Sequence, residues 1–124
     1  EAELLATEER AENAAYTRVV MDCGFSGDFV RLLAALAPCV MGYGEISARV
    51  AGEKTSEAYA DWIATYGGDD YQRLCRDVGA LLEGALTRRY GPGYQDLPVW
   101  EEVCATFTQA TRLEVGFWDM GLTP

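Results

Sequence analysis

Residues 32–46 have the sequence LLAALAPCVMGYGEI, and this stretch organises the whole chain. Its apolar side chains recur at alternating steps of four and three, which places them on one helical face. The members of this stripe are Leu32, Leu36, Cys39, Tyr43, Ile46 and Val50. Pro38 has no N–H to bond the carbonyl of Ala34, so we expect a kink there. The stretch predicts a long buried helix over about residues 28–51.

Two interpretations of Cys39 and Tyr43 are open. Buried cysteine is usually an inert small hydrophobe, and tyrosine on an apolar stripe is usually part of the core. The alternative is a reactive thiol with a phenol one helical turn further on. The spacing alone does not decide between them, although core packing is the commoner outcome for these residue types.

A second stripe runs along the last predicted helix, which Asp96 and Pro98 open. It consists of Val103, Phe107, Ala110, Glu114, Phe117 and Gly121. A buried carboxylate is costly to desolvate unless it has a partner, and general acid/base groups are made in such surroundings. Glu114 is therefore a candidate acid/base. Alternatively it lies at the edge of the bundle or pairs with a cation such as Arg88 or Arg112.

The remaining pattern is helical throughout. The chain has 124 residues, of which 49% are hydrophobic, and this suits one all-α domain built as a helical bundle with short connections. Further helices are expected over residues 2–12, with Asn13 interrupting, and over 14–23. Another is expected from Thr55 or Ser56 to the Gly67-Gly68 stop, and one more is capped by Asp69. We find no period-2 strand pattern.

Charge and residue content exclude several classes of function. The net charge is −10 and the basic residues are scattered, which argues against nucleic acid and against anionic membrane surfaces. No apolar run approaches the length of a membrane span. The four cysteines form no C-x-x-C pair, so we expect no metal site, no cofactor and a reducing, cytoplasmic compartment. The absence of histidine removes Ser-His and Cys-His catalytic pairs.

Three motifs, in this order, resemble the TenA (thiaminase II) family. They are APCVMGYGEI at residues 37–46, YADWIATY at 59–66 and LEVGFWD at 113–119. The resemblance implies an all-α, haem-oxygenase-like bundle that assembles as a homotetramer. Members with cysteine at this position hydrolyse aminopyrimidines, or thiamin itself, in thiamin salvage. The product is 4-amino-5-hydroxymethyl-2-methylpyrimidine.

The resemblance also implies residue roles. Cys39 would be the nucleophile that adds to the pyrimidine ring, and Glu114 the acid/base. Tyr66 would orient the Cys39 sulfur, Tyr43 would line the pyrimidine pocket, and Phe117 would form its wall.

The chain matches only the C-terminal part of the family domain, so residues 1–124 are expected to be a single all-α segment of it. The aspartate that grips the aminopyrimidine, and the aromatic residues that sandwich it, belong to the N-terminal half. That half is expected to complete the bundle, as a separate segment or chain; the other possibility is that this chain is a partial copy without activity. The alternatives are a non-catalytic bundle that binds a pyrimidine or a partner helix, and a structural module.

Overall fold

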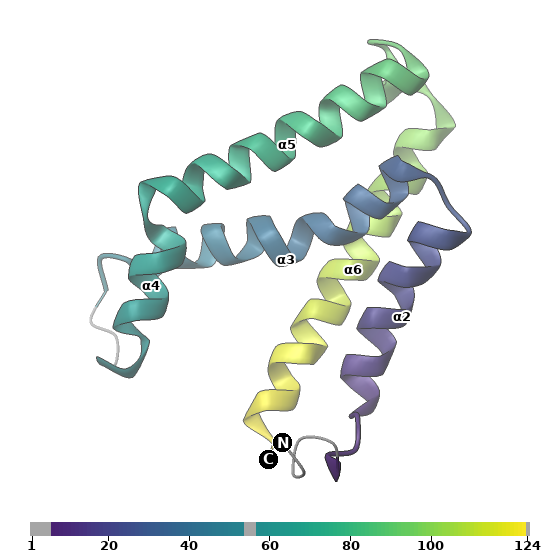
Figure 1. The fold of residues 1–124 in the computed structure, drawn as a ribbon. Helices are drawn as coiled ribbons and strands as arrows, with labels where there is room; N and C mark the ends of the chain where they lie inside the picture. Colours follow the sequence, from purple (N-terminus) through teal and green to yellow (C-terminus); the bar gives the residue numbers. More distant parts are fainter. Residues whose placement is uncertain (1–5, 54–56, 124) are drawn as a thin grey trace.

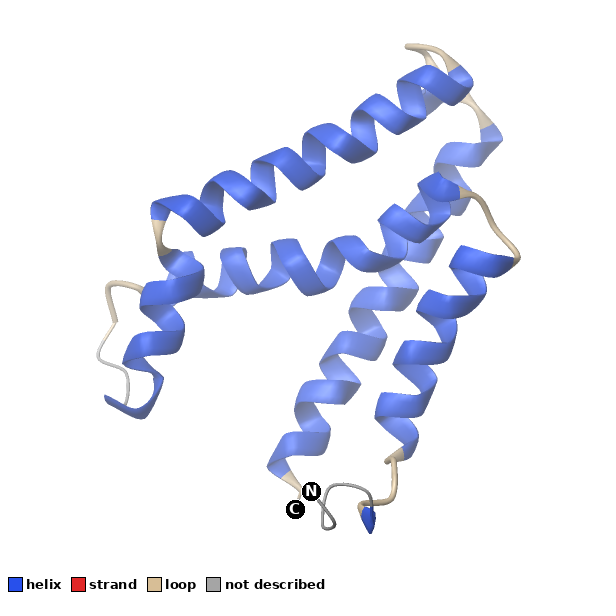
Figure 2. Cartoon of the chain, in the orientation of Figure 1, coloured by secondary structure: helices blue, strands red, loops and turns tan. Residues whose placement is uncertain are grey.

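The computed structural model describes residues 6–53 and 57–123, and in these ranges every regular element is a helix (Figure 2). The all-α prediction is confirmed. The elements in chain order are α2 (Ala11–Phe25), α3 (Phe29–Val50), the 3₁₀ turn η1 (Glu57–Tyr59), α4 (Ala60–Gly67), α5 (Asp69–Tyr90), the 3₁₀ turn η2 (Tyr94–Asp96) and α6 (Pro98–Leu122).

Helix α3 is the centre of the fold, as the sequence predicts. It packs against α2, α4, α5 and α6. Figure 1 shows α5 running alongside α3, α4 at one end of it, and α2 and α6 side by side. The helix assignment continues through Pro38 without a break.

Small side chains let these helices approach closely. Ala34, Ala85, Leu86 and Val103 form a buried cluster between α3, α5 and α6. A second cluster joins α2, α3 and α6 through Cys23, Ala35 and Ala110. Because alanine side chains are short, the helix backbones pack close together with little interdigitation of side chains. The larger apolar side chains remain near the surface.

The predicted stripes are only partly buried. Ile46 is 47% exposed and Phe107 is 41% exposed, so neither belongs to the core. The buried face of α6 instead consists of Val103, Thr106, Ala110 and Glu114. The apolar period was identified correctly, but no described helix covers the outer edge of either stripe. This leaves large apolar side chains in contact with solvent.

Several predicted boundaries need correction. Asn13 does not interrupt the first segments, because it lies inside α2. Gly68, rather than Asp69, is the N-cap of α5, while Gly67 ends α4 as expected. Residues 7–10 are not helical, residues 1–5 lie outside the described residues, and so do the predicted caps Thr55 and Ser56.

Asp28 caps α3 and connects it to the end of α5. Its carboxylate accepts hydrogen bonds from the Arg31 N–H at 2.9 Å and from the Tyr90 hydroxyl at 2.8 Å. It also pairs with Arg89, at 2.9 Å. Burial opposes the charged form, but these three partners together lower the pKa of Asp28.

Arg10 forms a similar connection at the opposite end of the molecule. Its guanidinium donates to the carbonyl of Met120 at 3.2 Å and to the carbonyl of Thr123 at 2.5 Å. These carbonyls lie at the C-terminal end of α6, where a cation is favourable. The start of α2 is thereby fixed to the end of α6.

Helix α3 is also the one helix of the described residues that is long and apolar enough to cross a membrane. The central helix of a water-soluble bundle meets the same criterion, and α3 packs against four other helices. The expectation of no membrane contact therefore stays a prediction.

Candidate active site

Four polar side chains from three helices meet where α2, α3 and α6 pack together. Tyr16 comes from α2, Cys39 and Tyr43 from α3, and Glu114 from α6. Glu114 is 9% exposed, so the buried carboxylate expected from the sequence is confirmed. The Tyr16 hydroxyl and Glu114 Oε2 are buried, and neither has a hydrogen-bond partner of standard geometry among the described residues. Unpaired buried polar atoms are rare, and they mark this site as functional or incomplete.

Both phenols titrate well above the usual range of tyrosine. Burial raises the pKa of Tyr16, and its interactions with Glu114 and Cys39 raise it further. Burial raises the pKa of Tyr43 to about 12, and the Glu114 carboxylate contributes to this shift. Both hydroxyls therefore keep their protons near neutral pH and can donate hydrogen bonds.

Cys39 lies half-buried on α3 with its thiol in contact with its own helix. The Sγ donates to the carbonyl of Leu36, at 3.0 Å. Burial raises the pKa of the Cys39 thiol and the Glu114 charge adds to this effect, whereas interaction with Tyr16 lowers it. The net shift is upward, so Cys39 is a protonated thiol at neutral pH and needs a base to become a nucleophile.

Glu114 has no cationic partner among the described residues. The ion pairs of these residues involve Glu12, Glu45, Asp70 and Asp28, but not Glu114. The sequence-based alternative, in which Glu114 pairs with Arg88 or Arg112, is therefore wrong. A buried carboxylate beside a thiol and two phenols, without a nearby cation, is suited to accepting and returning a proton.

Aromatic rings surround Tyr43. Its ring centroid lies 5.8 Å from that of Trp62, 5.1 Å from that of Tyr66 and 5.5 Å from that of Trp118. Tyr66 in turn contacts Tyr71 edge-on, at 4.7 Å. These rings come from α3, α4, α5 and α6, and a flat heteroaromatic ligand is the kind of molecule that such a group holds.

Glu114 and Tyr43 line a cavity of about 160 Å³ between α3 and α6, together with Pro38, Gly42, Ile46, Phe107, Thr111, Val115 and Trp118. Cys39 lines a different cavity, of about 290 Å³, with Tyr16 and neighbouring residues of α2. The thiol and the carboxylate therefore border separate spaces. Tyr16, which interacts with both groups, links them.

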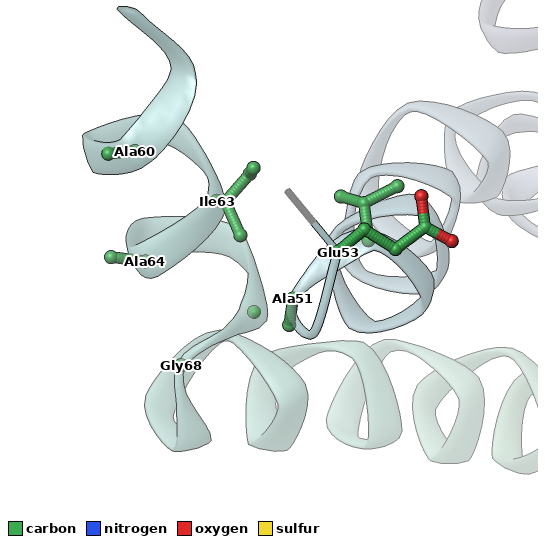
Figure 3. A pocket seen from close by; sticks show the side chains of 8 residues that line it. Ala51, Glu53, Ala60, Ile63, Ala64 and Gly68 are labelled. Atoms are coloured by element: carbon green, nitrogen blue, oxygen red, sulfur yellow. The ribbon is translucent and has the colours of Figure 1, made fainter. Parts of the chain in front are cut away.

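A further pocket, of about 450 Å³, lies at the far end of α3 and contains none of the predicted site residues (Figure 3). Small and apolar groups from α4 and from the residues that follow α3 and α4, including Ile63, Ala51 and Gly68, form most of its wall. In the described part of the chain, no group of three His, Cys, Asp or Glu side chains could hold a metal ion.

The structure brings the predicted site residues together to different degrees. Cys39, Tyr43 and Glu114 influence one another directly. Tyr66 joins them through the Tyr43 ring, and no hydrogen bond connects it to Cys39 within the described residues. The Phe117 ring packs against Tyr16 at 6.4 Å.

Sequence reasoning missed Tyr16 as a site residue. The available signal was its position as the one hydroxyl-bearing residue on the apolar side of the second predicted segment, with Val19, Val20 and Cys23. Trp62 and Trp118, which belong to the matched motifs, were also not predicted to lie beside Tyr43.

The chain is similar to several known proteins. An uncharacterised protein of Haemophilus influenzae is 34% identical over 125 residues, which cover 98% of this chain and 55% of that protein. An aminopyrimidine aminohydrolase of Halalkalibacterium halodurans is 29% identical over 121 residues, which cover 95% of this chain and 51% of that enzyme. The chain thus spans about half the length of these two relatives.

A solved structure agrees with these matches. The crystal structure of a protein from Silicibacter sp. TM1040, described as a TenA family transcription regulator, superposes with a TM-score of 0.93 and 61% identity. The match covers 100% of this chain and 55% of that one. Residues 1–123 also match the family model described as TENA/THI-4/PQQC family. On these grounds the chain belongs to the TENA/THI-4/PQQC family.

Proposed function

We propose that this chain supplies the nucleophile and the acid/base of an enzyme that hydrolyses aminopyrimidines in thiamin salvage. The observation that carries the proposal is the group of Cys39, Tyr16, Tyr43 and Glu114, in which a buried carboxylate without an ion-pair partner lies near a half-buried, protonated thiol. The similarity to an aminopyrimidine aminohydrolase supports the same reaction class.

The proposed chemistry begins with a proton transfer. The Cys39 thiol gives its proton to Glu114, through Tyr16 or directly, and the sulfur forms a bond to a ring carbon of the pyrimidine. Glu114 returns the proton to a ring nitrogen. The bond between the methylene carbon and the amine of the aminomethyl group then breaks, and the amine takes up a proton and leaves as ammonia. Water adds its hydroxyl group to the methylene carbon and gives up a proton. The carbon–sulfur bond breaks last, the ring nitrogen returns its proton to the thiol, and the aromatic ring is restored. The sum is one water consumed and one ammonia released.

The other side chains hold the ring in place. Tyr43, within its group of aromatic rings, provides a stacking surface, and Tyr66 and Phe117 support that surface and Tyr16. We propose that the segment corresponding to the remaining half of the relatives contributes the groups that grip the amino group, and that the protein is a homo-oligomer. The free thiols of all four cysteines are compatible with a cytoplasmic enzyme.

A second candidate is a non-catalytic bundle that binds a pyrimidine or another protein. The observation that favours it is the raised pKa of Cys39, because activated cysteines usually have lowered values. The description of the Silicibacter protein as a regulator fits this candidate. A net charge of −10 argues against direct contact with DNA.

Turnover of 4-amino-5-aminomethyl-2-methylpyrimidine by the full-length protein that carries residues 1–124 tests the proposal. Cys39→Ser should remove turnover, and Glu114→Gln should lower the rate by about 10²- to 10⁴-fold, the usual range for a general acid/base. Cys104→Ser and Glu101→Gln, which change exposed residues of α6, are the matched controls and should retain the parent rate. Activity of Cys39→Ser close to that of the parent would refute the proposed role of Cys39 as nucleophile and favour the non-catalytic bundle.

A further inference from the structure

Gln72 connects the two helices that carry the neighbouring rings of Tyr43 and Tyr66. It lies in the first turn of α5, and it is half-buried. Its side-chain nitrogen Nε2 donates to the carbonyl of Gly44 on α3 and to the carbonyl of Tyr66 on α4, both at 3.0 Å. A side-chain amide has two N–H donors, so these two bonds use both of them. One side chain of α5 therefore joins α3 to α4.

The two carbonyls belong to the backbone that carries the two rings. One is the carbonyl of Tyr66 itself, and the other is that of Gly44, which directly follows Tyr43 along α3. The ring centroids of Tyr43 and Tyr66 lie 5.1 Å apart. A change in the separation of the two backbones at these points would therefore change the separation of the two rings.

Helix α4 depends on contacts of this kind for its position. It has 8 residues, and a helix this short is not stable by itself in water. The carbonyl of Tyr66 lies in its last turn, where the carbonyls of a helix lack partners within the helix. The Gln72 amide provides a partner for this carbonyl. It thereby fixes the end of α4 that carries Tyr66.

The glycine at position 44 makes room for the Gln72 amide. A Cβ atom at this position would lie 3.2 Å from Gln72 Nε2 and 2.6 Å from Cys75 Sγ. Glycine is unfavourable in a helix interior relative to alanine, and the close approach of α5 accounts for its presence here. The absence of a side chain lets the amide reach the carbonyl of the same residue.

We infer that Gln72 is a positioning residue for the aromatic surface that holds the pyrimidine ring, and that it acts through Tyr66. The inference rests on the proposed function, in which the ring stacks on Tyr43 and Tyr66 supports that surface. None of the hydrogen bonds that Gln72 makes in the described part of the chain reaches Cys39 or Glu114. Loss of the amide should therefore weaken binding of the ring and leave the chemical step almost unchanged.

Gln72→Met tests this role, because it keeps the length of the side chain and removes both donors. The measurements are the KM for 4-amino-5-aminomethyl-2-methylpyrimidine and the Kd of 4-amino-5-hydroxymethyl-2-methylpyrimidine, both in the full-length protein. Each should rise about two- to tenfold, the range expected for one aromatic contact. The kcat should stay near the parent value, because binding is lost equally in the ground state and the transition state. Gln72→Asn, whose shorter amide cannot reach both carbonyls, should act in the same direction.

Tyr90→Phe is the matched control for the loss of a hydrogen bond between α5 and α3. Tyr90 lies at the other end of α5, and its hydroxyl donates to the carboxylate of Asp28, the N-cap of α3, at 2.8 Å. This variant should lower the Tm, as Gln72→Met does, but keep the parent KM and Kd. An equal rise of KM and Kd in both variants would show that lost stability is the cause, and it would overturn the inference.

A double-mutant cycle with Tyr66→Leu tests whether Gln72 acts through Tyr66. If it does, Gln72→Met should raise the Kd in the parent but have little further effect in Tyr66→Leu. An unchanged Kd in Gln72→Met overturns the inference, and so do effects that simply add. A parent protein that binds the pyrimidine without turnover would refute the proposed function, and the Kd comparison would still test Gln72. A parent protein that binds no pyrimidine would overturn both.

Discussion

The two glycines of α3 allow a matched test of the packing, because the same substitution should have opposite effects two residues apart. Gly42→Ala adds a methyl group in open space, and Gly44→Ala adds one 2.6 Å from Cys75 Sγ. Both replacements gain the same helix propensity, about 1 kcal/mol. Only the second must move a neighbour, and the Cys75 thiol is itself in contact with the Val40 carbonyl, at 3.6 Å.

The expected difference follows from this comparison. Gly42→Ala should stabilise the protein by about 0.5–1 kcal/mol. At Gly44 an overpacking cost of about 1–3 kcal/mol opposes the same gain, so the net effect should range from about neutral to about 2 kcal/mol destabilising. The propensity gain cancels between the two variants. Their difference in unfolding free energy therefore measures the contact between α3 and α5 directly.

Urea and thermal melts of the full-length protein provide the measurement. Each 1 kcal/mol corresponds to about 2–4 °C in Tm for a protein about twice as long as this chain. Cys75→Ala removes the obstructing sulfur and should recover part of the loss when combined with Gly44→Ala. Equal stability of the two single variants would refute the close approach of α3 and α5, as would a double variant that recovers nothing.

Three further outcomes are expected. Because the pKa of Asp28 is lowered on folding, its contribution to the free energy of unfolding is present above about pH 4 and is lost as the pH falls through the pKa of the folded state. Asp28→Asn should therefore weaken the dependence of stability on pH in acid, which melts at several pH values would measure. Because burial raises the pKa of Cys39, iodoacetamide should modify it slowly at pH 7 and faster as the pH rises, and a bound aminopyrimidine should protect it; fast labelling at neutral pH would contradict the assigned environment. Residues 1–124 expressed alone should self-associate in sedimentation experiments through exposed apolar side chains such as Phe107, Trp118 and Val115, whereas a stable monomer would argue against that.

The local features of this fold could be predicted from the sequence. The apolar period located α3 over about residues 28–51, and the Gly67-Gly68 pair ended α4. Glu114 was correctly expected to be buried, because a carboxylate at that register of α6 turns inward. These predictions depend only on neighbours within a few turns of one helix.

The relative placement of the helices could not be predicted in the same way. Phe107 and Ile46 continue the apolar period, yet they are exposed because no described helix covers their side of the bundle. Tyr16 was missed because its importance arises from the packing of α2 against α3 and α6, not from its local pattern. Interhelical geometry depends on which small side chains meet, and a periodic pattern does not specify this.

The Arg10 contacts at the end of α6 constrain the number of residues between Arg10 and Tyr16. Arg10 lies six residues before Tyr16 on α2, and Met120 lies six residues after Glu114 on α6. The number of residues from the Arg10–Met120 contact to the site is therefore the same on both antiparallel helices. Each residue of an α-helix turns it by about 100°. One residue inserted between Arg10 and Tyr16 would therefore rotate the phenol away from the carboxylate while the terminal contact stayed in place. The Arg10 contacts therefore fix the rotation of α2 relative to α6. Substitutions between Arg10 and Tyr16 leave this rotation unchanged, whereas an insertion or deletion there would alter it.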